Sequence, residues 1–303
     1  MLTERVEQYV ALRRATGFKF LDSERLLRGF ARCAAERGEE HIRAATAVAW
    51  ATEARSQSER HRRLRLVTRL AQFIRVEDPH HEIPPQDVFY ARAVRPAPHI
   101  YSEQDVAKIV GYAAKLGPPG SLRPLTYSTM FGLMAVAGLR RGEALELRIS
   151  DFTGDGLLIR ATKFRKSRFT PLHETTITQL EHYLEARRRV AGQTDHLFVS
   201  LHRRQFSPHT VLRTFHEVCE QAGIGRTVAG TRPRLQDLRH TFAVRALERC
   251  PAGRDQVNRH MLALTTYMGH ACVESTYWYL ERTPQLLRDI ANACDTLVAG
   301  GGA

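Results

Sequence analysis

Cysteine is scarce in this chain, and its pattern excludes two classes of protein. The 303 residues include five cysteines, which are scattered, odd in number and never arranged as Cys-x-x-Cys. Small secreted domains held by disulfides use a dense and even set of cysteines, and many structural zinc sites bring two cysteines close together. The pattern therefore indicates reduced thiols in a cytosolic protein.

Long apolar runs are also absent. No stretch approaches the roughly 20 apolar residues that cross a bilayer. The first five residues, MLTER, lack the apolar segment of a signal peptide. We expect a soluble, cytoplasmic protein with no membrane partner.

Motifs for a metal or a cofactor are missing as well. The chain has 14 histidines, but the segment nearest to a ligand set is His80–His81, beside Asp78 and Glu82. A solvated loop explains this segment more simply than a metal site does. We therefore expect no metal and no cofactor.

Basic residues outnumber acidic ones. The 45 Lys and Arg residues against 32 Asp and Glu residues give a formal net charge of +13. This excess suits a polyanionic partner, although a basic surface alone does not distinguish nucleic acid from anionic lipid. The excess is spread over both halves of the chain, so both halves are candidates for contact with the polyanion.

The hydropathy pattern divides the chain near residue 95. Residues 4–75 carry apolar side chains at helical spacing, which predicts a bundle of four or five helices. Four prolines between residues 84 and 98 predict an extended connector. Ser102, with Asp105 three residues later, predicts a new helix that starts with a capping box. We expect a helical domain over residues 1–95 and a second domain over residues 96–303.

The second domain mixes helices with a little sheet. Residues 125–137 are mainly apolar and uncharged, which predicts a buried central helix that ends at Gly138. Residues 157–161 and 168–172 predict a β-hairpin with its turn at 162–167. Further helices are expected over 175–190, from Ser207, over 237–249, over 255–267 and from Ser275. The predicted fold class is mainly α with a small β-sheet (α+β).

An ordered set of cationic and nucleophilic residues runs through the second domain. Cationic donors stabilise the charge of a phosphoryl-transfer transition state, and a side chain can act as the nucleophile, so such a set can cut a phosphodiester without a metal. Each fragment alone has an ordinary explanation as a helix end or a turn. Their common order and spacing favour the chemistry. The set is Arg140, Lys163, Arg239, His270 and Tyr279.

This set resembles the active site of the tyrosine recombinases, the phage integrase family, over the second domain and more loosely over the first. The resemblance implies that Tyr279 attacks a DNA phosphate and forms a 3′-phosphotyrosyl link. Arg140, Arg239 and His270 would hold the nonbridging oxygens. Independently of the resemblance, Glu143 lies three residues after Arg140, where a carboxylate can brace the guanidinium; an ordinary surface ion pair of little energetic worth is the alternative. Lys163 would protonate the 5′ hydroxyl, with Lys166 as the rival candidate. The resemblance also implies double-stranded DNA as partner, a homo- or hetero-tetramer on DNA, and association with the nucleoid.

One position departs from the family pattern. The family usually has histidine, less often lysine, three residues before the second arginine, where this chain has Gln236. Glutamine can form a hydrogen bond but cannot accept a proton at neutral pH. His240 is near in sequence, yet the family commonly has a histidine there too, so it is not an evident substitute.

A crowded basic segment in the first domain is the candidate DNA contact. A solvated basic face is the ordinary interpretation, and contact with DNA phosphates is the functional one, which the catalytic set favours. The segment contains Arg60, Arg62, Arg63, Arg65 and Arg69.

The biological role is less specified by the sequence. The first domain looks more like recombinases of mobile elements than like chromosome-dimer resolvases. An apolar stripe between Leu286 and Leu297 predicts a C-terminal helix, which packs either on its own domain or on a neighbouring protomer. Three alternatives stay open: a type IB topoisomerase, a catalytically weak DNA-binding relative, and a basic helical protein of unrelated function.

Overall fold

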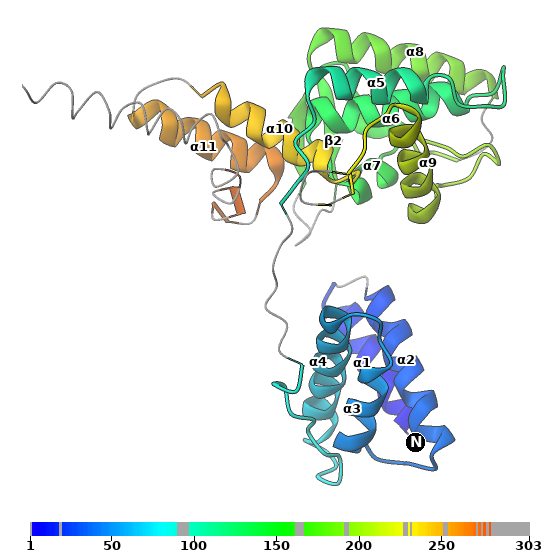
Figure 1. The fold of residues 1–303 in the computed structure, drawn as a ribbon, viewed down its shortest axis with the longest axis vertical. Helices are drawn as coiled ribbons and strands as arrows, with labels where there is room; N and C mark the ends of the chain where they lie inside the picture. The colour runs from blue at the N-terminus through cyan, green and yellow to red at the C-terminus, as the bar shows by residue number, and fades with distance from the viewer. Residues whose placement is uncertain are drawn as a thin grey trace, which may run out of the picture. The chain divides into compact units, whose positions relative to one another are not determined.

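The computed structural model describes residues 2–17, 20–89, 97–160, 167–190, 194–226, 230, 232–250, 254–270, 272–273, 275–276 and 279. The chain divides into two compact units, Met1–Arg95 and Pro96–Ala303 (Figure 1). No helix in the described ranges combines the length and the apolar character needed to cross a bilayer.

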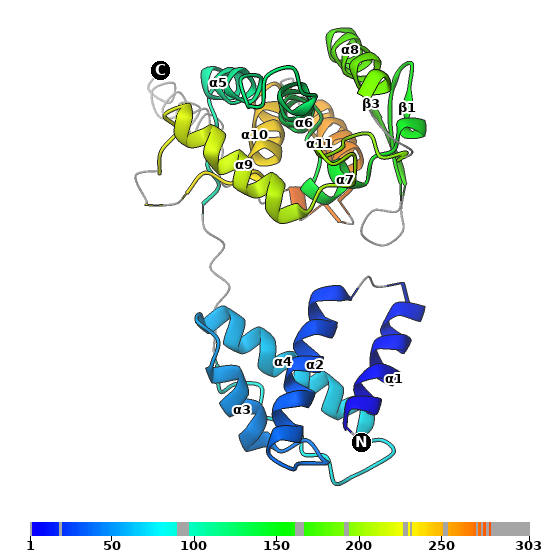
Figure 2. The same ribbon diagram turned by 90° about the vertical axis from the view of Figure 1, so that its right-hand side faces the viewer.

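The first unit is a bundle of helices. Its elements are α1 (Leu2–Ala15), α2 (Leu21–Glu36), α3 (Ala44–Thr52) and α4 (Gln57–Ile74). Helices α2 and α4 each pack against the other three (Figure 2). Leu27, Phe30 and Leu70 are fully buried between them. The Ser56 hydroxyl accepts a hydrogen bond from the Glu59 backbone and so caps α4, the helix that carries the basic segment.

The second unit contains a small sheet among helices. Its elements are α5 (Glu103–Ala113), α6 (Arg123–Ala137), α7 (Arg141–Glu146), η1 (Ile149–Asp151), β1 (Phe152–Thr153), β2 (Gly156–Ile159), β3 (Arg168–Pro171), α8 (Glu174–Val190), α9 (Pro208–Gln221), α10 (Asp237–Glu248) and α11 (Arg254–Met268). Helix α6 packs against α5, α8 and α10 (Figure 2). The predicted α+β class, mainly helical with a small sheet, is confirmed.

Several local predictions are confirmed by the backbone. The Ser102 hydroxyl and the Asp105 carboxylate form the capping box at the start of α5. Strands β2 and β3 pair antiparallel, as the predicted hairpin requires. Its turn residues 162–166 lie outside the described part of the chain, as does the apolar stripe between Leu286 and Leu297.

The position after α6 requires glycine, Gly138, for two physical reasons. Its φ of 59° lies in the left-handed region that favours glycine. A Cβ atom at this position would also lie 2.5 Å from the Phe242 ring on α10. The tight turn places Arg140 directly after the buried helix.

Candidate active site

Four of the predicted catalytic residues come from separate segments of the second unit. Arg140 is the N-cap residue of α7, Arg239 lies in α10, and His270 follows α11. Tyr279 lies further along the chain. Hydrogen bonds, ring stacking and charge interactions bring these four side chains into one cluster.

Glu143 anchors the first arginine. Its carboxylate accepts hydrogen bonds from the Arg140 backbone at 2.9 Å and from Arg140 Nη1 at 2.6 Å. Burial alone would raise the pKa of Glu143, but the hydrogen bonds and charges of Arg168 and then Arg140 lower it to about 2. Arg140 Nη2 also donates to the Gly269 carbonyl at 3.0 Å. Its side chain is 30% exposed, so the fixed guanidinium stays accessible to an anion.

Arg168 is a component of the cluster that the sequence analysis missed. Its Nη1 and Nη2 atoms donate to the two Glu143 oxygens at 3.0 and 2.9 Å, and its Nε donates to the Tyr267 carbonyl at 2.7 Å. Strand alternation could have indicated that Arg168 faces inward, because Arg168 and the buried Thr170 share one face of β3. That pattern alone does not reveal that Glu143, 25 residues earlier, is the partner.

Arg239 is held by carbonyl groups at two helix ends. Nη1 donates to Gly138 O at 2.5 Å and Nη2 donates to Met268 O at 2.7 Å. The free carbonyls at a helix C-terminus carry partial negative charge, which favours a cation there. Only 1% of Arg239 is exposed. Burial and then the charge of Arg140 lower the pKa of Arg239 to about 10, so the group stays charged at neutral pH.

A chain of hydroxyl groups determines which nitrogen of His270 carries the proton. Thr265 Oγ1 donates to the Met261 carbonyl at 2.7 Å, so its single hydrogen is used. Thr276 Oγ1, 2.9 Å away, must therefore donate to Thr265. His270 Nδ1, at 2.7 Å from Thr276 Oγ1, must in turn donate to Thr276. The neutral ring then presents an unprotonated Nε2.

The other side of the His270 ring agrees with this assignment. Nε2 accepts a hydrogen bond from Arg239 Nη2 at 3.0 Å, and a guanidinium can only donate. Burial and then the charges of Arg239 and Arg140 lower the pKa of His270 to about 4. The imidazole is thus neutral at neutral pH, with its orientation fixed at both nitrogens.

Tyr279 lies next to two histidines. Its ring stacks on His270, with centroids 5.9 Å apart and planes 16° apart. The His240 ring lies 5.4 Å away. Tyr279 is 4% exposed and packs in an apolar cluster that includes Leu264 and Met268. The nucleophile candidate is therefore next to His270 and one contact away from Arg239.

Two further predicted residues of the second unit, Gln236 and His240, lie at the start of α10, and the two candidate lysines are not described. Gln236 is half-buried at the N-terminus of α10. His240 follows one turn later, with Nε2 4.0 Å from the Asp237 carboxylate. Lys163 and Lys166 lie outside the described residues.

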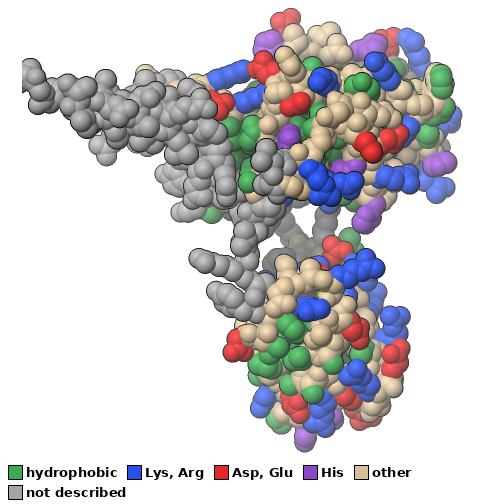
Figure 3. Space-filling view, viewed as in Figure 1, with side chains coloured by type: hydrophobic (Ala, Val, Ile, Leu, Met, Phe, Trp, Pro, Cys, Tyr) green, Lys and Arg blue, Asp and Glu red, His purple; other side chains and the backbone are tan. Residues whose placement is uncertain are grey.

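The basic segment of the first unit separates into two groups on α4. Arg62, Arg65 and Arg69 are exposed and follow one helical stripe. Arg60 instead donates to Ala54 O at 2.9 Å. Arg63 donates to Trp50 O at 3.2 Å, with its guanidinium over the Trp50 ring. Figure 3 shows Lys and Arg side chains on the visible face of both units.

Comparison with known sequences decides the family. The sequence profile of the phage integrase family matches residues 101–285. The chain belongs to this family, the tyrosine recombinases. Its activity is therefore the breaking and rejoining of DNA strands. The integrase/recombinase y4rB of Sinorhizobium fredii is 34% identical to this recombinase over 294 residues, which cover 94% of each chain.

Solved structures confirm the recombinase fold. The XerH recombinase in a post-cleavage complex with its difH substrate gives a TM-score of 0.67 at 18% identity, over 97% of this chain and 85% of XerH. A lambda integrase tetramer bound to a Holliday junction gives 0.63 at 16% identity, over 92% of this chain and 76% of the integrase.

Proposed function

We propose that this recombinase exchanges DNA strands at specific sites through a covalent bond between Tyr279 and a 3′ phosphate, during integration and excision of a mobile element. The observation that carries the proposal is the convergence of Arg140, Arg239, His270 and Tyr279 from separate segments. The names of the lambda and S. fredii integrases support the mobile-element role.

The charges of the cluster support the assignment of roles. Arg239 interacts with Tyr279, and Arg140 interacts with Arg239 and His270, so two positive charges lie in the cluster where negative charge develops on the phosphate oxygens. Each guanidinium offers rigid N–H donors that match phosphate geometry. Glu143 and Arg168 position Arg140 without adding a net charge. We assign the role of general acid to Lys163 because of the family resemblance alone.

Phosphate binding changes the chemistry of His270. Its neutral Nε2 accepts from Arg239 and so cannot donate to an oxyanion. A phosphate beside the ring adds negative charge, which favours the doubly protonated imidazolium. We infer that binding of the scissile phosphate leads His270 to take up a proton from solvent at Nε2. The protonated Nε2 then no longer accepts from Arg239 and donates to a nonbridging oxygen instead.

The exposed stripe of α4 supports a DNA contact in the first unit. Arg62, Arg65 and Arg69 can each neutralise a phosphate, and Arg62 would first leave its exposed ion pair with Glu59. Arg60 and Arg63 instead donate hydrogen bonds to backbone carbonyls of the bundle. We assign residues 1–95 to DNA binding and residues 96–303 to catalysis. A tetramer on DNA is the working assembly, as the lambda integrase complex supports.

A nicked suicide substrate tests the catalytic proposal. Its duplex is one that the full chain selects from a random-sequence library. The wild type should form a covalent adduct, Tyr279→Phe should bind the duplex and form none, and Tyr277→Phe should still form one. An adduct with Tyr279→Phe would refute the assignment of the nucleophile.

Gln236 specifically favours a second candidate, a DNA-binding relative with weak catalysis, because the usual proton acceptor is absent. The same substrate separates the two functions. A wild type that binds the selected duplex, forms no adduct and gains one through Gln236→His would establish the second candidate.

A further inference from the structure

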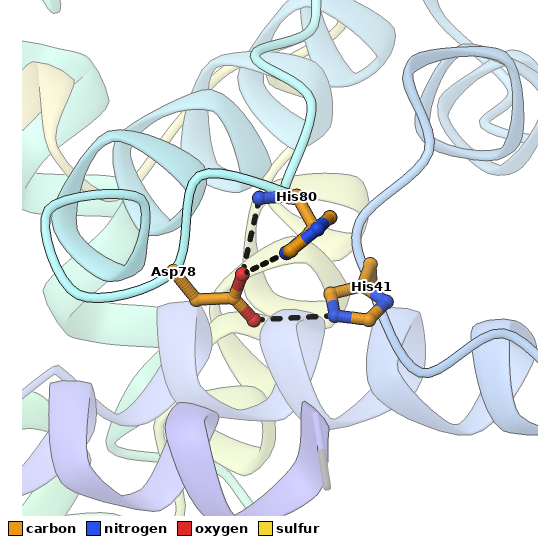
Figure 4. Close-up of side chains that lie close together, drawn as sticks. All are labelled: His41, Asp78 and His80. Carbon is orange, nitrogen blue, oxygen red and sulfur yellow. Dashed lines mark hydrogen bonds and ion pairs between the residues drawn. The ribbon is translucent and has the colours of Figure 1, made fainter.

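Three potential metal ligands converge in the first unit, between the loop after α2 and the loop after α4. His41 Nε2 lies 3.2 Å from Asp78 Oδ2, and His80 Nδ1 lies 2.8 Å from Asp78 Oδ1 (Figure 4). The ligand atoms of all three residues lie within 4.8 Å of one another. His80 is 78% exposed at its side chain, so the cluster is open to solvent.

The two loops are joined by contacts that do not involve these three side chains. The Ile42 backbone N–H donates to His81 Nδ1 at 3.0 Å, and the Glu82 N–H donates to Ile42 O at 2.9 Å. The Glu82 carboxylate accepts from the Ala44 N–H at 2.7 Å. These contacts hold the backbones next to His41 and Asp78 together without an ion, and only side-chain movements are needed to close the site.

His81 supports the cluster but is not a ligand. It is 3% exposed, and its Nδ1 accepts a backbone hydrogen bond. The neutral ring therefore carries its proton on Nε2, which points to Asp78 Oδ2 at 3.5 Å. This second contact orients the carboxylate, as outer groups commonly do for metal ligands.

We propose that His41, Asp78 and His80 form a binding site for a divalent transition metal ion of the Zn²⁺ class. Two imidazole nitrogens and one carboxylate oxygen suit such ions, whereas Mg²⁺ and Ca²⁺ prefer oxygen ligands alone. Zinc bonds of roughly 2.0–2.2 Å require ligand atoms about 3.5 Å apart, so a movement of about 1 Å closes the site. A water molecule completes the four ligands.

The bound ion would join the α2–α3 loop to the segment after α4. His41 lies 37 residues before Asp78, so the Asp78–Glu82 segment on its own resembles a solvated loop and folding supplies the third ligand. Without an ion, His80 forms a hydrogen bond with the Asp78 carboxylate, and His41 Nε2 lies at ion-pair distance from it. The proposal does not depend on the catalytic assignments.

Calorimetric titration of Zn²⁺ into the metal-free, reduced full chain tests the site. We expect a binding event that His41→Ala and His80→Ala each weaken by at least about tenfold, since loss of even an outer partner commonly costs that much. His202→Ala, which removes an exposed histidine of the second unit, should leave the affinity unchanged. Zn²⁺ should raise the unfolding temperature of the wild type and not that of His80→Ala.

His80→Ala is the decisive variant, because an exposed side chain can be removed without loss of folding, and circular dichroism checks this. A wild type that does not bind Zn²⁺ overturns the proposal. So does an unchanged Zn²⁺ affinity in both His41→Ala and His80→Ala, which would place the ion elsewhere on the chain.

Discussion

Thr276→Val removes one hydroxyl group from the chain that orients His270. Valine keeps the volume and the β-branched shape of threonine, so packing around this fully buried residue changes little. His270 Nδ1 loses the acceptor that lies at 2.7 Å in the wild type. The ring is then free to change its tautomer or to turn, although its hydrogen bond to Arg239 stays possible.

The size of the effect follows from the hydrogen bond that is lost. A buried N–H left without an acceptor costs about 1–3 kcal/mol. If that cost falls on the transition state, cleavage slows by roughly 5-fold to 150-fold, since about 1.4 kcal/mol corresponds to a factor of ten. Affinity for DNA should change little, because Thr276 is buried and offers no surface to a phosphate.

The single-turnover rate of adduct formation on a nicked suicide substrate measures the effect. Thr276→Ser retains the hydroxyl and should cut at close to the wild-type rate. Thr266→Val is the matched control, because the Thr266 hydroxyl donates to Leu262 O on the exposed side of α11. If Thr276→Ser and Thr266→Val both cut at close to the wild-type rate, slow cleavage by Thr276→Val reflects the loss of His270 orientation and not a general loss of stability.

A double-mutant cycle decides whether Thr276 acts through His270. In a His270→Gln background, Thr276→Val should slow cleavage no further, because the group it orients is already gone. The same slowing in both backgrounds, or a wild-type rate for Thr276→Val alone, would refute the reasoning.

Three further predictions concern DNA contact, the departure from the family pattern, and pH. Arg62→Ala combined with Arg65→Ala should flatten the slope of log affinity against log salt by about 1.8, or about 0.9 for each phosphate contact. An unchanged slope would show that these arginines form a solvated basic surface that does not contact DNA. Gln236→Ala should cut only modestly slower than the wild type, and Gln236→His should still cut. Single-turnover cleavage rates check both expectations. Loss of all cleavage in Gln236→His would contradict the second expectation. The pKa of His270 falls from 6.5 to about 4 on folding, so stability should drop as pH falls from 6.5 toward 4, where only the unfolded chain binds the proton. Urea unfolding should show a smaller drop for His270→Gln, and equal drops in both proteins would contradict the assignment.

The sequence was sufficient for features that depend on near neighbours. The capping box of Ser102 and Asp105 and the left-handed stop at Gly138 arise within a few residues, so local composition predicts them. The hairpin of β2 and β3 likewise follows from two short apolar segments and the turn between them. The catalytic set was found by its order along the chain, and its grouping was an expectation of the family resemblance.

Only the tertiary structure decided which distant side chains meet. The pairing of Arg168 with Glu143, the hydroxyl chain from His270 to Thr265 and the approach of His41 to Asp78 all cross segment boundaries. The arginines of α4 looked alike in sequence, and packing against Trp50 separated Arg63 from the exposed stripe. The physical reason is that hydrophobic periodicity specifies which face of an element is buried, whereas a hydrogen bond requires a particular partner within about 3 Å, and only the packed chain supplies it.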